Sequence, residues 1–284
     1  MKKYIVITVL FFCLTLFSGM SDKGPSVFTP AVVQTVLDHS LAAVSYFEVP
    51  QEEVDQIIAR LAAGGLTSQR VMPGWPLAVP VTGQDGKRVV AVFGAATLLQ
   101  DGYAITVSHL FYIEDKEGVP LKMLQAWVFQ RNTDHPVVVE VVRSTPRGGE
   151  DPFYNDYAVI RLKEDLRLPG VNVAKEGLFQ GEPVMFAGTV NGAAFFARFG
   201  FVTAFQRFFR KDDKGILHLS QWTSFPLVCI YPGGGGDSGG GVFNAAGELV
   251  GVMYCGMQVG TETVVFSNPL VMLKEFLAAN KQEN

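Results

Sequence analysis

The sequence predicts a fold built mainly from β-strands, and two features carry that prediction. From about residue 77 onward, short runs rich in Val, Phe and Thr alternate with turn signals. The turns are marked by Asp-Gly, Gly-Gly and Ala-Gly pairs, as at 101–102, 148–149 and 246–247. Many short strands at this spacing indicate an all-β barrel or sandwich and argue against alternating βαβ units.

Helical spacing is confined to the two ends of the chain. Apolar side chains recur every three or four residues over 29–44, where Thr29 is placed as an N-cap and Pro30 at the first helical position. The pattern returns over 54–61, so we expect two short N-terminal helices. A similar spacing over 270–277 predicts one helix near the C-terminus.

The first residues have the pattern of a secretory signal peptide. Two lysines at 2–3 precede an apolar stretch over 4–17 and a run of mostly small residues at 18–21. The apolar stretch is shorter than the roughly 20 residues that a membrane-spanning helix needs. We therefore expect cleavage near Ser21, export to the periplasm or the medium, and no stable membrane insertion of the mature chain.

These patterns divide the chain into a signal peptide over 1–21, a helical N-terminal extension over 22–75 and a β-domain over 76–284. Hydrophobic residues make up 48% and charged residues 18% of the 284 positions, which favours a folded globule. The net charge of -4 and the lack of any Lys/Arg run argue against nucleic acid as a partner. The four histidines have no zinc-type spacing, so no metal is expected.

A glycine-rich pentapeptide over 236–240 contains the strongest chemical signal, Ser238. A serine hydroxyl is a weak nucleophile, so it must stand in a tight turn that exposes Oγ and points backbone amides at the developing oxyanion. The glycines permit such a turn, and the N–H groups of Gly236 and Ser238 are the expected oxyanion donors. Taken alone, the segment is equally compatible with a glycine-rich surface loop.

Two further residues complete a constellation with Ser238. His109 lies just past the end of a strand-like run over 103–107, where a barrel can hold an imidazole rigidly. Asp156 begins an alternating strand pattern and can accept the Nδ1–H of that histidine. Each of these alone would be an ordinary polar or turn residue. Their order along the chain, His then Asp then Ser, is that of chymotrypsin and differs from that of subtilisins and α/β-hydrolases.

With these motifs the chain resembles the trypsin-like serine peptidases, and most closely the protease domain of the bacterial HtrA proteases. The resemblance covers roughly residues 90–279 and includes the Gly-Glu-Pro-Val run at 181–184 and the Asn-Pro pair at 268–269. It implies a chymotrypsin-like double six-stranded β-barrel, here with an N-terminal helical extension and a C-terminal helix. We expect no PDZ domain, which HtrA proteases carry after the protease domain.

The resemblance also implies an activity. It predicts a secreted serine endopeptidase, a hydrolase of protein or peptide substrates that needs no cofactor. Ser238 would be the nucleophile, His109 the general base and Asp156 the residue that orients the base.

The substrate pocket that the same resemblance implies has walls without charged side chains. Its expected lining residues are Tyr231, Tyr254, Cys255 and Gly256. A charged substrate side chain would lack a partner there and would carry a desolvation cost of several kcal/mol. We therefore expect cleavage after small or medium apolar residues.

Three questions stay open at this point. The glycine run at 233–236 is longer than is usual in the family, so a catalytically silent barrel that binds peptides or a partner protein is the alternative function. Cys229 and Cys255 lie, by the resemblance, on strands around the pocket and form either a disulfide or two free thiols. The oligomeric state is not predicted.

Overall fold

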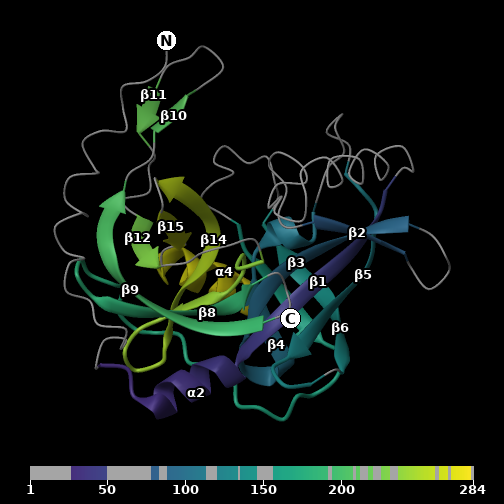
Figure 1. Cartoon of the computed structure of the whole chain (residues 1–284), viewed down its shortest axis with the longest axis horizontal. Helices are drawn as coiled ribbons and strands as arrows, with labels where there is room; N and C mark the ends of the chain where they lie inside the picture. The colour runs from purple at the N-terminus through teal and green to yellow at the C-terminus, as the bar shows by residue number, and fades with distance from the viewer. Residues whose placement is uncertain are drawn as a thin grey trace.

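Two β-barrels lie side by side in the protein (Figure 1). The structure is a computed structural model. It describes residues 27–49, 78–82, 88–112, 120–133, 135–145, 156–190, 194–206, 209–211, 217–219, 225–230, 236–259, 262–267 and 270–282.

The first sheet has seven strands in the order β1-β5-β6-β7-β4-β3-β2. Their bounds are β1 Ser40–Glu48, β2 Ala78–Thr82, β3 Arg88–Leu98, β4 Tyr103–Thr106, β5 Met123–Gln130, β6 Pro136–Ser144 and β7 Ala158–Leu162. Because β1 pairs with both β5 and β3, six of these strands close into a ring, and β2 pairs with β3 outside that ring. Val90, Ile105 and Val128 are fully buried in this barrel, as the alternation of strand side chains requires.

The second barrel is a closed ring of six strands in the order β12-β15-β14-β13-β8-β9. Their bounds are β8 Pro183–Val190, β9 Ala194–Gln206, β12 Phe225–Ile230, β13 Gly241–Phe243, β14 Leu249–Val259 and β15 Glu262–Ser267. A separate two-stranded sheet pairs β10 Phe209–Lys211 with β11 Leu217–Leu219. Two closed six-stranded rings confirm the expected all-β double barrel.

Helices at both ends of the chain match part of the prediction. The first is α2 Pro30–Asp38, where the N–H of Val32 donates to Oγ1 of Thr29 at 3.3 Å, so Thr29 is the N-cap as expected. The last is α4 Leu270–Gln282, which confirms the C-terminal helix. Two short 3₁₀ turns, η1 Gln100–Gly102 and η2 Ser108–Leu110, flank β4.

The helix expected to run on to residue 44 is wrong, because the chain leaves the helix at Asp38 and enters β1. Leu41 and Val44 have helical spacing, but almost every residue from Leu41 to Phe47 is apolar or small and is buried. A continuous apolar run of this kind suits a strand paired on both sides as well as it suits a buried helix. Pairing with β3 and β5 decides for the strand, so this part of the expected helical extension belongs to the first barrel.

Other expectations fall on residues outside the described ranges. The signal peptide over 1–21, the second helix over 54–61 and Tyr231 are among them. Within the described part of the chain, no helix has both the length and the apolar character to span a membrane.

Candidate active site

The structure brings His109 and Asp156 together at one end of the first barrel. His109 lies in η2, which begins one residue after β4 ends, and Asp156 lies two residues before β7, which pairs with β4. Nδ1 of His109 is 2.5 Å from Oδ2 of Asp156, and both side chains are mostly buried. Since the carboxylate accepts at Nδ1, the neutral imidazole carries its proton there and leaves Nε2 as the free base.

The second oxygen of Asp156 is also held. Its Oδ1 accepts from the hydroxyl of Ser108 at 2.6 Å and from the backbone N–H of His109 at 3.0 Å. Burial by itself would raise the pKa of Asp156, but the charge and hydrogen bonds of His109 and the Ser108 hydroxyl outweigh it and lower the pKa to about 2. Asp156 is therefore a carboxylate at neutral pH, fixed on both oxygens.

A polar and an aromatic layer lie behind this pair. Thr145 Oγ1 donates to Oγ of Ser108 at 3.3 Å and accepts from the backbone N–H of Tyr157 at 3.0 Å. The ring of Tyr157 is fully buried and stacks on Phe276 of α4, with centroids 5.4 Å apart. The C-terminal helix thus packs against the residue that follows Asp156.

The loop that carries Ser238 is fastened to the first barrel. The N–H of Ala95 in β3 donates to the carbonyl oxygen of Ser238 at 2.7 Å. A Cβ on the neighbouring Gly94 would lie 2.8 Å from that oxygen and would overlap the side chain of Leu110, which follows His109. Gly94 therefore lets the nucleophile loop approach the residues around the histidine.

The same loop is also fastened to the second barrel. Gly239 N–H donates to the carbonyl of Met253 at 2.8 Å. Thr189 Oγ1 lies 3.1 Å from the carbonyl oxygens of both Gly94 and Gly236, which share its one hydroxyl proton. Gly236 has φ of 93° and Gly239 has φ of 91°, a backbone region that glycine occupies without strain. These contacts place Ser238 at the junction of the two barrels.

The expected oxyanion donors lie in this turn. Among the described residues, nothing accepts a hydrogen bond from the N–H of Gly236 or Ser238. Nor does a hydrogen bond join Ser238 Oγ to His109 Nε2 among the described side chains. The structure thus pairs His109 with Asp156 and holds the Ser238 loop by its backbone beside the turn that contains His109. Catalytic hydrogen bonds are often long or poorly aligned in unliganded sites.

The expected pocket residues are only partly described. Tyr254 is buried in β14, and Cys255 and Gly256 follow it on that strand, opposite Phe266 and Val265 of β15. The substrate preference drawn from these walls stays a prediction.

The register of the second barrel argues against the disulfide. Strand β15 pairs with both β12 and β14, so it lies between Cys229 and Cys255. Neighbouring strands are about 4.8 Å apart, which places Cα atoms separated by one strand roughly 9–10 Å apart. A disulfide needs Cα atoms within about 7 Å. Of the two options, the register therefore favours free thiols.

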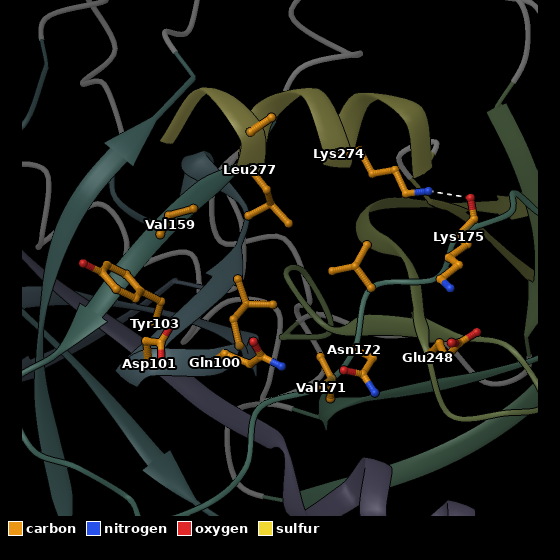
Figure 2. A pocket seen from close by; sticks show the side chains of 13 residues that line it. Gln100, Asp101, Tyr103, Val159, Val171, Asn172, Lys175, Glu248, Lys274 and Leu277 are labelled. Carbon is orange, nitrogen blue, oxygen red and sulfur yellow. Dashed lines mark hydrogen bonds between the residues drawn. The ribbon is translucent and has the colours of Figure 1, made fainter. Parts of the chain in front are cut away.

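A cavity of about 820 Å³ lies apart from the candidate active-site residues (Figure 2). It is enclosed by the start of β4, by residues 171–175 of the segment between the two barrels, and by α4. Gln100, Asn172 and Leu277 are among the side chains around it. Lys274 Nζ donates to the backbone carbonyl of Lys175 at its edge. No residue of the candidate active site lines this cavity.

Solved structures with the same fold are found among bacterial proteases. The protease Rv3671c of M. tuberculosis H37Rv matches as an inactive-form mutant with a TM-score of 0.59 and 15% identity, over 93% of this chain and 97% of the other. Its active form matches with a TM-score of 0.55 and 16% identity, over 92% and 91%. A variant of the HtrA-type protease AlgW with a decapeptide matches with a TM-score of 0.56 and 17% identity, over 89% and 66%.

The sequence itself matches a known family. No curated protein matches the chain. The model of the trypsin-like peptidase domain matches residues 82–252, which span both barrels and include His109, Asp156 and Ser238. These residues are more than half of the chain, and the protein therefore belongs to the trypsin-like peptidase domain family.

Proposed function

We propose that the protein is a serine endopeptidase that hydrolyses peptide bonds through an acyl-enzyme on Ser238. The observation that carries this proposal is the buried pair of His109 and Asp156, joined at 2.5 Å. It lies where the loop of Ser238 is tied to β3 beside the histidine turn. Membership of the trypsin-like peptidase family supports the same reaction class.

The four residues then divide the catalytic steps among them. Ser238 Oγ attacks the carbonyl carbon of the scissile bond while His109 Nε2 takes the hydroxyl proton. The amides of Gly236 and Ser238 stabilise the oxyanion, and Asp156 stabilises the imidazolium. His109 returns the proton to the departing amine as the C–N bond breaks, and then activates the water that hydrolyses the ester. Side chains and backbone amides of the protein supply all of these steps.

A fluorophosphonate probe tests the proposal, because it reacts with an activated serine and not with a serine in an inert loop. We expect stoichiometric labelling of wild-type protein at Ser238 and none of Ser238→Ala, which should keep its fold and lose at least about 10⁴-fold in peptide hydrolysis. Undiminished hydrolysis by Ser238→Ala would refute the assignment. An unlabelled wild-type protein that still binds peptides would establish the binding-module alternative.

Two finer parts of the proposal rest on the sequence. We propose cleavage after small or medium apolar residues. The preference should be graded and not absolute, because one methylene changes the free energy of discrimination between substrates by only about 1–3 kcal/mol. AlgW is a solved neighbour with bound peptides, which supports peptides as the substrate class. A peptide-library digest tests the preference, and dominant cleavage after Arg, Lys or Glu would contradict it.

We also propose that the protein acts outside the cytoplasm, on the basis of the pattern at residues 1–21. Mass spectrometry of the mature N-terminus is the test. An intact N-terminus on a membrane-embedded product would contradict cleavage.

A further inference from the structure

The cavity beside α4 combines an apolar wall with a charged rim (Figure 2). Its volume of about 820 Å³ lies within the range of small-molecule sites, roughly 300–1,000 Å³. The wall comes from the first barrel, from the segment between the barrels and from α4, and its apolar residues are Leu99, Val159, Val171, Val173, Leu277 and Ala278. Such a wall is stabilised when an aliphatic group displaces the water against it.

Two lysines lie together on one side of this cavity. Nζ of Lys274 in α4 donates to the backbone carbonyl of Lys175, so the helix is joined there to the segment between the barrels (Figure 2). An ammonium group has three donors, and this contact uses one of them. Within the described part of the chain, neither lysine forms an ion pair with a carboxylate.

The acidic side chains of the rim do not neutralise the two lysines. Glu248 lies on the same side, but its carboxylate accepts from the side-chain amide of Asn244 at 2.9 Å, in the turn between β13 and β14. Asp101 lies across the cavity beside Tyr103 and is exposed, so water screens its charge (Figure 2). With two ammonium groups against one carboxylate, the lysine side favours an anionic ligand group over a cationic one.

We propose that this cavity binds a free aliphatic carboxylate, the chemistry of a medium-chain fatty acid. The carboxylate would pair with Lys175 and Lys274. The hydrocarbon chain would cover Val159, Val171 and Leu277. An inorganic anion would leave this apolar wall against water. The proposal does not rest on the function proposed above, because no residue of the candidate active site lines the cavity.

A bound chain would also hold α4 against the first barrel. Leu277 follows Phe276, whose ring stacks on Tyr157, and Val159 lies two residues after that tyrosine in β7. A ligand between Leu277 and Val159 contacts both elements. We therefore expect it to raise the melting temperature and to slow hydrogen exchange in α4 and in the segment between the barrels. Exchange in β5, which contributes nothing to the cavity, should stay unchanged.

Calorimetric titration of the full chain with butanoate, hexanoate, octanoate and decanoate, each below its micelle concentration, tests the apolar part. Affinity should rise by up to about fourfold for each methylene and stop rising once the chain fills the cavity. Octanamide, which has the same chain without the charge, should bind about tenfold more weakly than octanoate. Equal affinities for butanoate and octanoate, or for octanoate and octanamide, would overturn the proposal.

Substitutions at the rim test the place of the carboxylate. Lys175→Gln and Lys274→Gln should each weaken octanoate binding by up to about fivefold, and the double variant by about tenfold or more, while octanamide binding stays unchanged. The control is Lys122→Gln, which removes the same charge from an exposed lysine paired with Glu48 and should bind octanoate like wild type. Wild-type affinity for octanoate in the double variant would overturn the proposal.

Ala278→Trp tests the location without changing a charge. Ala278 is exposed on α4 and lines the cavity, so an indole there fills part of the cavity and leaves the core intact. We expect octanoate affinity lower by about tenfold or more, at an unchanged melting temperature of the free protein. Unchanged affinity would place the site elsewhere. If a variant does not fold, the chain-length series and the hydrogen exchange of wild type still decide, because neither needs a substitution.

Two further measurements separate this site from peptides and from the proposed peptidase. Acetyl-Leu-Val-Leu carries the same carboxylate on a peptide, and tighter binding of it than of octanoate by Ser238→Ala would assign the cavity to a peptide C-terminus and overturn the proposal. Wild type labelled by fluorophosphonate should bind octanoate as unlabelled protein does, and loss of binding would place the ligand in the active site. If no labelling occurs, the proposed peptidase activity fails, and the octanoate titration still tests the cavity.

Discussion

Replacing Ser108 by alanine tests how the buried carboxylate of Asp156 is held. The Ser108 hydroxyl donates to Oδ1 at 2.6 Å and is 4% exposed as a residue, so water cannot easily replace it. A hydrogen bond to a charged group contributes about 1.5–3 kcal/mol, against about 0.5–1.5 kcal/mol for a neutral pair. Ser108→Ala should therefore lower the free energy of unfolding by about 2 kcal/mol at pH 7.

Ser40→Ala is the matched control. Ser40 is also a fully buried serine of the first barrel, but its hydroxyl donates to the neutral carbonyl of Val36 at 2.9 Å. Ser40→Ala should therefore lower the free energy of unfolding by only about 1 kcal/mol.

The two variants should differ in their pH dependence. The pKa of Asp156 falls from 3.8 to about 2 in the folded protein, so its ionised form stabilises the native state above about pH 4, by about 2 kcal/mol. That contribution is lost as the pH falls through the folded pKa near 2. Without the hydroxyl the folded pKa moves back toward 3.8, so Ser108→Ala should differ from wild type less at pH 2 than at pH 7.

Urea denaturation at pH 7, 4 and 2 gives the required free energies. The gap between wild type and Ser108→Ala should shrink toward acid, whereas the gap for Ser40→Ala should stay constant. Equal pH dependence in the two variants would show that Ser108 is only a packing residue and that the reasoning about Asp156 is wrong.

The remaining predictions concern the nucleophile turn and the helix behind Asp156. At Gly239 the backbone φ is 91°, and a Cβ would overlap the Ala95 carbonyl and the Thr106 hydroxyl, so Gly239→Ala should lower the melting temperature and slow fluorophosphonate labelling. The control Gly177→Ala, where a Cβ meets nothing within 4 Å, should match wild type. Unchanged labelling in Gly239→Ala would contradict the described turn. Phe276→Ala removes the ring stacked on Tyr157 and should lower the free energy of unfolding, measured by urea denaturation, by about 3–5 kcal/mol. The control Phe179→Ala, at a residue that is 66% exposed, should leave that free energy almost unchanged. Similar values for the two variants would mean that α4 does not support the active site.

Local sequence signals were sufficient for the elements whose chemistry is local. The N-cap at Thr29 was predictable because an N-cap is defined by residues within one helical turn. The pairing of His109 with Asp156 was predictable because strand ends position both, and the order of the motifs limited the alternatives.

Features that depend on distant pairing were not predictable in the same way. Whether 41–47 becomes helix or strand is decided by β3 and β5, which lie far away in the sequence. The contact of Thr145 with Ser108 needs the register of strands that no short pattern specifies. Arg198 is the one charged residue in the sequence of β9 Ala194–Gln206, but its partner Asp237 could be identified only from the folded barrel.

Strand β1 has a consequence for how much of the N-terminal region the protein can lose. It is the first of the strands that the structure describes, and it closes the first ring by pairing with strands that follow it by dozens of residues. A truncation that enters β1 Ser40–Glu48 would leave unpaired edges on β3 and β5, and exposed edges of this kind recruit other chains. Proteolytic shortening that enters β1 is therefore expected to give an aggregate.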